Sequence, residues 1–333
     1  MESAIIVGID EAGYGPLLGP LVVSAVAFEV PAQYLREGND SAEGVDLWKL
    51  LRAAVSRKPL KRGSRLAIAD SKLLYDSADH ENGLTLLERA ALTFLMQNGP
   101  MPATLREILC RICPAICDDL GLYPWYAPDE LQLPMQAAAA VLGTQRNALR
   151  IAMEQAGVQF RGAWVEVVPE GHFNRMVEAT RNKAVVLFTQ TIRLIERITA
   201  DLGPRPLRIW GDRHGGRIGY RAALMTAFDG VPLDVLDESP QHSAYRLRRA
   251  ASPFVIRFME KGESKQLPIA LASIYSKYVR ELFMACFNRY WKSQLADLKP
   301  TAGYYTDGQR FLTDIETVIA RQQLDRKWLV RMA

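Results

Sequence analysis

The sequence predicts an α/β fold. Two observations carry this prediction: short apolar runs typical of strands recur along the chain, and amphipathic stretches long enough for helices separate most of them. Strands that alternate with helices are typical of a sheet covered by helices. The apolar runs lie at residues 5–9, 21–28, 163–168, 207–210, 233–236 and 254–258.

The first two runs predict a hairpin, because Gly13, Gly15, Pro16, Gly19 and Pro20 supply a bend between them. Helices are predicted where apolar residues recur every three or four positions, and glycine or proline marks several of their ends. The expected helices span residues 45–55, 84–97, 134–155, 171–201, 220–228 and 267–291, with Gly157 and Gly203 ending the third and the fourth.

Composition describes an ordinary globular protein. With 333 residues, 49% of them hydrophobic, the chain is long enough to bury a large core in one large domain or two smaller ones. The net charge of +4, from 41 basic and 37 acidic residues, hints only weakly at a polyanionic partner. Four cysteines, the absence of an apolar run of about 18 residues and an N-terminal apolar segment interrupted by acids favour a soluble cytoplasmic protein without disulfides.

Two stretches leave alternatives open. A basic patch at residues 57–65 is either a solvated face or a phosphate-facing surface; its cations are Arg57, Lys58, Lys61, Arg62 and Arg65. In the proline- and aromatic-rich region 98–134, Cys110, Cys113 and Cys117 have helical spacing. Structural zinc needs four ligands and Cys286 is distant in sequence, so core cysteines are favoured over a metal site.

Acidic residues follow two of the apolar runs. Asp10 and Glu11 end the first, and Asp212 ends the run at 207–210, while Glu281 lies on the predicted helix 267–291. Carboxylate oxygens are the ligands that Mg²⁺ and Mn²⁺ prefer, and two such ions can activate water and stabilise the leaving oxygen in phosphodiester hydrolysis. Nearby cations suited to balancing phosphate charge are Lys72, Arg213, Lys261, Lys265, Lys277 and Arg280.

Four segments, in order, resemble motifs of the type 2 ribonucleases H, that is, ribonuclease HII and its relatives. Residues 8–20, Gly-Ile-Asp-Glu-Ala-Gly-Tyr-Gly-Pro-Leu-Leu-Gly-Pro, resemble the opening motif, and residues 70–72 resemble the Asp-Ser-Lys segment. Residues 261–281 resemble the Lys-Gly-Asp loop and the Ala-Ser-Ile-x-x-Lys-x-x-Arg-Asp helix of the family, and Gly-Tyr-Tyr-Thr at 303–306 resembles its Gly-Tyr-x-Thr motif.

The resemblance implies an RNase H-like fold, with a mixed central sheet flanked by helices and with helical insertions. It implies a discontinuous catalytic domain at 1–97 and 160–315, an inserted helical region at 98–159 and a C-terminal helical tail at 316–333. The implied catalytic and metal-binding acids are Asp10, Glu11, Asp212 and Glu281. The implied nucleic-acid contacts are Gly13, Tyr14, Gly15, Ser71, Lys72, Arg213, Lys261, Lys265, Ser273, Lys277, Arg280 and Tyr304.

The implied reaction uses two Mg²⁺ or Mn²⁺ ions. It is hydrolysis of the RNA strand of an RNA/DNA hybrid, or cleavage 5′ to a ribonucleotide embedded in duplex DNA, leaving a 3′-hydroxyl and a 5′-phosphate. Nucleic acid is therefore the expected partner, and no membrane association is expected.

The sequence departs from the family pattern at several positions. Glu281 stands where the family usually has Asp, Asp212 follows Trp-Gly instead of preceding Gly, and Tyr14 replaces a basic residue between two glycines. Gln309 lies near the position of a family histidine; His214 is either its functional substitute or, as favoured here, a surface histidine in a basic loop. Two alternatives stay open: a nuclease on the same scaffold that cleaves DNA structures or single strands, and a catalytically inactive nucleic-acid-binding relative.

Overall fold

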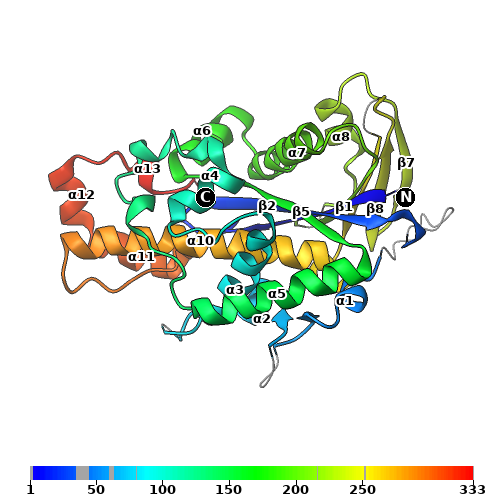
Figure 1. The fold of residues 1–333 in the computed structure, drawn as a ribbon. Helices are drawn as coiled ribbons and strands as arrows, with labels where there is room; N and C mark the ends of the chain where they lie inside the picture. The colour runs from blue at the N-terminus through cyan, green and yellow to red at the C-terminus, as the bar shows by residue number, and fades with distance from the viewer. Residues whose placement is uncertain are drawn as a thin grey trace.

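A seven-stranded mixed sheet forms the centre of the protein, here a computed structural model that describes residues 3–34, 45–59, 64–79, 81–215, 217–250 and 253–332 (Figure 1). The strand order is β5-β2-β1-β6-β9-β8-β7. β1, β6 and β9 run parallel to one another, and the other neighbours pair antiparallel. The strands are β1 Ser3–Ala12, β2 Leu21–Pro31, β5 Gln159–Val168, β6 Leu207–Asp212, β7 Leu233–Glu238, β8 His242–Leu247 and β9 Phe254–Met259; β3 Val55–Ser56 and β4 Leu66–Ala67 pair separately.

Helices cover both faces of the sheet. The α-helices are α1 Leu47–Leu50, α2 Ser71–Leu74, α3 Thr85–Leu95, α4 Leu105–Ile112, α5 Ala139–Ala156, α6 Glu170–Thr180, α7 Lys183–Leu202, α8 Arg221–Ala227, α9 Gly262–Lys265, α10 Leu267–Gln294, α11 Tyr305–Asp314, α12 Glu316–Gln322 and α13 Arg326–Leu329. Short 3-10 turns lie at Ala32–Tyr34, Met96–Asn98, Pro114–Ile116, Leu120–Leu122 and Pro128–Glu130. The predicted mixed sheet flanked by helices is therefore confirmed.

Alternation along the strands separates two apolar clusters. Ile6, Val22 and Phe28 face the cluster built mainly from α3, α5 and α10, whereas Ile5 and Val23 face the one that contains α6, α7 and α8. Figure 1 shows α7 and α8 above the sheet and α3, α5 and α10 below it. Among the described residues, no helix combines the length and apolarity needed to cross a membrane.

Helix α10 lies directly against the first strand. A Cβ atom built on Gly8 would overlap the backbone of Pro268 and Ile269, so only glycine permits this approach. The close packing fixes the polar side chains of α10 relative to the carboxyl end of β1. The expected helix 267–291 is confirmed, and it extends to Gln294.

Several predicted elements differ in extent. The expected helix 45–55 is a single short helix, α1, followed by a turn and β3. The helix expected from residue 134 begins at Ala139, because the amides of residues 135–137 instead donate to the Glu88 carboxylate at 2.7 Å each. The expected helix 171–201 is two helices, since Arg181 adopts a left-handed conformation and the Asn182 side chain caps α7.

Two further predictions change in detail. Strand β8 went unpredicted, and it pairs with β9 and with β7 at the edge of the sheet. Of the cysteines expected in the core, Cys113 is buried but Cys110 is exposed at the surface of α4, so the core prediction is wrong for Cys110. Lys61 and Arg62 of the basic patch lie outside the described residues, and the division into catalytic domain, insert and tail stays a prediction.

Candidate active site

Three of the predicted acids meet at the carboxyl ends of two neighbouring parallel strands. The register of β1 and β6 pairs Ile9 with Gly211, so the next residues, Asp10 and Asp212, lie side by side. Glu11 follows Asp10 at the same end of β1. Parallel strands bring such residues together although about 200 positions separate them in sequence.

Burial raises the pKa of all three carboxyl groups, and repulsion within the group adds to it for Asp10 and Glu11. Burial is the largest cause for Asp10, whose pKa lies well above its usual range, and the charges of Glu11 and Asp212 add to it. Burial and then Asp212 raise the pKa of Glu11 to about 7. The pKa of Asp212 is raised chiefly by burial. A group of acids that resists ionisation in this way is stabilised by a cation among them.

Backbone amides orient two of these carboxylates. The Glu11 amide donates to Asp10 Oδ1 at 2.8 Å, and the Gly262 amide donates to Asp212 Oδ1 at 2.8 Å. These hydrogen bonds favour the ionised carboxylates and oppose the effect of burial. The loop between β9 and α10, which resembles the Lys-Gly-Asp loop, therefore positions the third acid directly.

The Asp70-Ser71-Lys72 segment lies across the same site. Asp70 caps the short helix α2 by accepting a hydrogen bond from the Lys72 amide at 3.0 Å. The sequence favoured Asp70 or Ser71 as the cap of the next helix, but that helix, α3, begins at Thr85. The Ser71 and Ser273 hydroxyls are 3.0 Å apart, and both residues are buried. The Lys72 charge lowers the pKa of both Glu11 and Asp212, so this cation faces the acids.

Sequence reasoning missed two further acids. Burial raises the pKa of Glu263, and Asp212 and Asp70 add to it by repulsion. Asp70 likewise raises the pKa of Asp212. Both residues stood inside motifs already noted, but the apolar-run pattern drew attention only to acids that end a strand.

Helix α10 contributes two serines to the site. Ser276 donates to the Asp10 carbonyl at 2.8 Å, and a hydrogen bond from Ser273 lowers the pKa of the Asp10 carboxyl. The serine predicted from the Ala-Ser-Ile segment to contact nucleic acid thus contacts the first acid and Ser71.

The fourth predicted acid, Glu281, is hydrogen-bonded to two cations and a tyrosine. Its Oε1 accepts from Lys277 Nζ at 2.6 Å and from Arg280 Nη1 at 3.3 Å, and its Oε2 accepts from the Tyr75 hydroxyl at 2.7 Å. Although burial acts in the opposite direction, Lys277 and Arg280 hold its pKa below the usual range. Both carboxylate oxygens therefore have protein partners, and the predicted role of Glu281 as a metal ligand stays a prediction.

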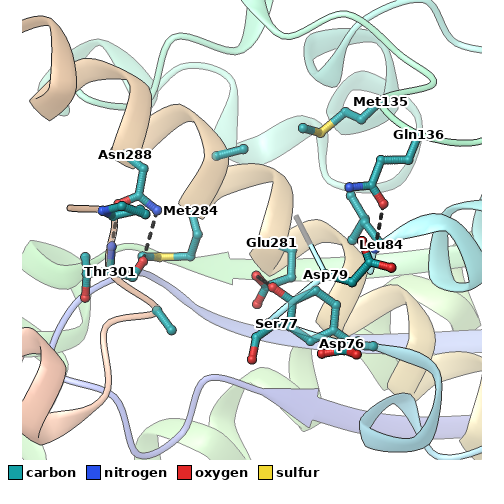
Figure 2. Close-up of a pocket in the computed structure, with 14 residues that line it drawn as sticks. Asp76, Ser77, Asp79, Leu84, Met135, Gln136, Glu281, Met284, Asn288 and Thr301 are labelled. Carbon is teal, nitrogen blue, oxygen red and sulfur yellow. Dashed lines mark hydrogen bonds between the residues drawn. The ribbon is translucent and has the colours of Figure 1, made fainter. Parts of the chain in front are cut away.

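A cavity of about 350 Å³ lies beside Glu281. Figure 2 shows Glu281 near Ser77 and Asp76, with Asn288 and Thr301 on the far side of the opening. Several polar groups on its wall are engaged: Asn288 exchanges two hydrogen bonds of 2.9 Å with Thr301, and Gln136 accepts from the Leu84 amide at 2.6 Å.

The glycine-rich loop at residues 13–19 is held from several directions. Gly303 O accepts from the amides of Leu17 and Leu18, and the Gly19 amide donates to the buried Glu170 Oε1 at 2.9 Å. Tyr14 is half-buried against the cluster that contains α6 to α8. Sequence reasoning gave no role to Glu170, because its partner lies 151 residues away.

Two buried arginines lie behind this loop. Arg280 donates to Leu18 O at 3.3 Å and to Ala302 O at 3.0 Å. Arg331 donates to Gly13 O and, at 2.9 Å, to Tyr14 O. Arg331 matches none of the motifs described above, and nothing in its local sequence marks it.

The remaining predicted nucleic-acid contacts vary in accessibility. Lys72, Lys261, Lys265 and Tyr304 are exposed, Arg213 and Lys277 are half-buried, and Arg280 is buried with its guanidinium 5.8 Å from the centre of the Tyr304 ring. His214 is buried, not at the surface as favoured from the sequence, because it packs edge-on against both Tyr220 and Phe258. Burial lowers its pKa to about 4.

Among the described residues, no group of three or more His, Cys, Asp and Glu side chains is arranged to hold a metal ion. The chemistry of the donor set nevertheless fits a hard divalent cation: Glu11 and Asp212 are close enough to raise the pKa of Asp10, and the three carboxyl groups carry only oxygen donors.

Comparisons with known proteins give a short sequence match and distant structural ones. No family model matches the chain. Ribonuclease HII from two strains of Xylella fastidiosa, M23 and Temecula1, is 46% identical to it over 42 residues, which are 13% of this chain and 18% of each relative. The match thus covers less than a fifth of the length of these curated relatives. This match supports the resemblance to a divergent type 2 ribonuclease H.

Similar solved structures include the PCNA:RNase HII complex from Archaeoglobus fulgidus, with a TM-score of 0.41 and 16% identity, covering 98% of this chain and 92% of that one. Bst-RNase HIII in complex with Mn²⁺ has a TM-score of 0.45 and 15% identity, covering 98% of this chain and 66% of that one. At these distances, the functional assignment depends on the residues of this chain.

Proposed function

We propose that this chain is a divalent-metal-dependent endonuclease of the type 2 ribonuclease H class. Its proposed reaction is hydrolysis of the RNA strand of RNA/DNA hybrids, or cleavage 5′ to ribonucleotides embedded in duplex DNA, giving 3′-hydroxyl and 5′-phosphate ends. The observation that carries the proposal is the meeting of Asp10, Glu11 and Asp212 at the ends of β1 and β6, within segments that resemble the family motifs.

Asp10, Glu11 and Asp212 are the residues that would hold Mg²⁺ or Mn²⁺. When bound, such ions supply a nucleophilic water at neutral pH and stabilise the leaving oxygen. The chain itself orients the carboxylates through the amides of Glu11 and Gly262. Lys72 faces the acids, and exposed Lys261 and Lys265 offer positive charge to the phosphates of a nucleic acid.

The test uses the purified protein with Mg²⁺ or Mn²⁺ and three labelled duplexes: all DNA, DNA with one embedded ribonucleotide, and an RNA/DNA hybrid. We expect cleavage of the two ribonucleotide-containing duplexes, with ends mapped as 3′-hydroxyl and 5′-phosphate. Asp10→Asn and Asp212→Asn should abolish it, whereas Asp229→Asn, at an exposed turn, serves as the matched control. Cleavage retained in the first two variants contradicts the proposal.

A second function is favoured by one observation. Both oxygens of Glu281 are engaged by Lys277, Arg280 and Tyr75, which is consistent with a nucleic-acid-binding relative that has lost catalysis. The same experiment separates the two, because metal-dependent cleavage of any duplex excludes an inactive protein. Equal cleavage of all three duplexes would instead indicate a nuclease with altered specificity, in line with Tyr14.

A further inference from the structure

We propose that Arg331 is a positioning residue that aims the backbone amides of Tyr14 and Gly15 at the ribose 2′-hydroxyl of the substrate. The inference rests on the proposed function. It explains how the loop could bind the substrate although Tyr14 replaces the basic residue of the family pattern. Arg331 lies outside the four motifs and about 320 positions from the loop that it contacts.

The contacts of Arg331 with the loop are direct. Its guanidinium donates to the carbonyls of Gly13 and Tyr14, and its own amide donates to Leu17 O at 2.9 Å. The side chain is 3% exposed and stacks 3.9 Å from the centre of the Phe173 ring. Since it is buried behind the loop, Arg331 acts on a ligand only through the backbone that it holds.

The geometry of the peptide bond determines where the amides of the loop point. In a trans peptide, the carbonyl of one residue and the amide of the next point in opposite directions. Because the carbonyls of Gly13 and Tyr14 point at Arg331, the amides of Tyr14 and Gly15 point away from it. Within the described part of the chain, neither amide has a hydrogen-bond acceptor.

The loop is open to solvent at Gly15. Gly15 is exposed, and a Cβ built on it would meet no heavy atom within 4 Å. The loop lies beside Glu11, whose charge contributes to the raised pKa of Tyr14. Two unpaired donors next to the acidic cluster suit an oxygen acceptor on the sugar at the cleavage position, and the 2′-hydroxyl is the acceptor that distinguishes RNA from DNA.

Charge strengthens the same donors. A guanidinium bonded to a carbonyl polarises the peptide unit and makes its amide a stronger donor. Arg280 adds a second positive charge, since its Nε would lie 2.6 Å from a Cβ built on Gly13. The family pattern has a positive charge at position 14. In this chain, Arg280 and Arg331 supply positive charge from behind the loop.

The segment that carries Arg331 is itself fixed. The Asn174 side chain donates to the carbonyls of Lys327 and Val330 and accepts from the Met332 amide, each at 2.7 Å. Trp328 packs against Gly171, where a Cβ would leave too little room for the indole. The segment that carries the guanidinium is therefore anchored to α6 in addition to its contacts with the loop.

The test compares Arg331→Ala and Arg331→Lys with Arg326→Ala, an exposed arginine of the same segment that pairs with Glu316 away from the loop. Binding to all-DNA duplex and to duplex with one ribonucleotide is measured by fluorescence anisotropy without divalent ions, and kcat and KM are measured with Mg²⁺. Thermal unfolding is followed for each variant.

We expect Arg331→Ala to reduce the preference for the ribonucleotide-containing duplex about tenfold, with affinity for all-DNA duplex unchanged, because it affects one hydrogen-bonded recognition contact. Its kcat should fall on the order of 10- to 100-fold through misplacement of the sugar. Arg331→Lys keeps the positive charge but cannot donate to both carbonyls in the same geometry, so its losses of preference and of kcat should be smaller than those of Arg331→Ala. Arg326→Ala should match the wild type.

An unchanged preference in Arg331→Ala overturns the inference, as does an equal loss on both duplexes accompanied by a lower unfolding temperature. If the alanine variant does not fold, Arg331→Lys decides by the same criteria. A wild-type protein that cleaves neither ribonucleotide-containing duplex contradicts the proposed function itself, and the inference falls with it.

Discussion

Glu11→Gln should make the protein more stable at pH 8 while abolishing cleavage. In the folded protein, burial and repulsion by Asp212 raise the pKa of Glu11 from its ordinary value of 4.5 to about 7. Folding therefore disfavours the ionised carboxylate, and glutamine, which has nearly the same shape, carries no such cost. Sites of this kind commonly exchange stability for function.

The magnitude follows from linkage. The folded protein binds the Glu11 proton more tightly than the unfolded chain, so stability falls as pH rises from about 4.5 to about 7 and stays at the lower level above that. The full shift corresponds to about 3 kcal/mol, and partial solvent access reduces this, giving a gain of about 1–3 kcal/mol for the variant at pH 8. Near pH 4.5 the gain should vanish.

Denaturant unfolding of both proteins at pH 4.5 and pH 8, without divalent ions, measures the free energy of unfolding directly. Adding Mg²⁺ should then raise the stability of the wild type more than that of the variant, because the cation relieves the repulsion that the substitution has already removed. A variant that is no more stable at pH 8, or whose gain is equal at both pH values, refutes this reasoning.

Three other predictions concern single positions. Gly8→Ala should lower the free energy of unfolding by about 1–3 kcal/mol or more, measured with denaturant, because the new methyl overlaps the backbone of Pro268. Glu281→Gln should cost about 3 kcal/mol at pH 7 by leaving the half-buried Lys277 without its anion. Because the pKa of Glu281 is lowered, this cost should shrink as pH falls below the ordinary value of 4.5, and equal destabilisation at pH 7 and at low pH would contradict this. Tyr14→Arg should steepen the logarithmic dependence of duplex binding on salt by about one unit, measured by anisotropy titrations, and an unchanged slope would show that position 14 does not approach phosphate.

The sequence allowed prediction of the parts of the site that depend on local pattern. Apolar runs that end in acids located Asp10 and Asp212, and parallel pairing of β1 and β6 then brought the two together. The helical periodicity around Ser273 likewise predicted α10. These features depend on neighbouring residues, which a sequence displays directly.

The rest depends on contacts between distant segments. No local pattern predicts that the Glu281 carboxylate accepts a hydrogen bond from Tyr75, which lies 206 positions away. Glu170 and Arg331 are charged residues that would ordinarily be assigned to the surface, yet both are buried because backbone groups of the loop 13–19 are their partners. Such burial becomes visible only in three dimensions.

The anchoring of the loop 13–19 has a consequence for biosynthesis. Its partners lie at Glu170, Arg280, Gly303 and Arg331, so the contacts span up to 318 positions. During translation the loop is made first and its last anchor some 300 residues later, which at about 5–20 residues per second takes on the order of 15–60 seconds. A nascent chain therefore carries Asp10 and Glu11 well before it can orient the loop, and the loop should reach its final geometry only after Arg331 has left the ribosome.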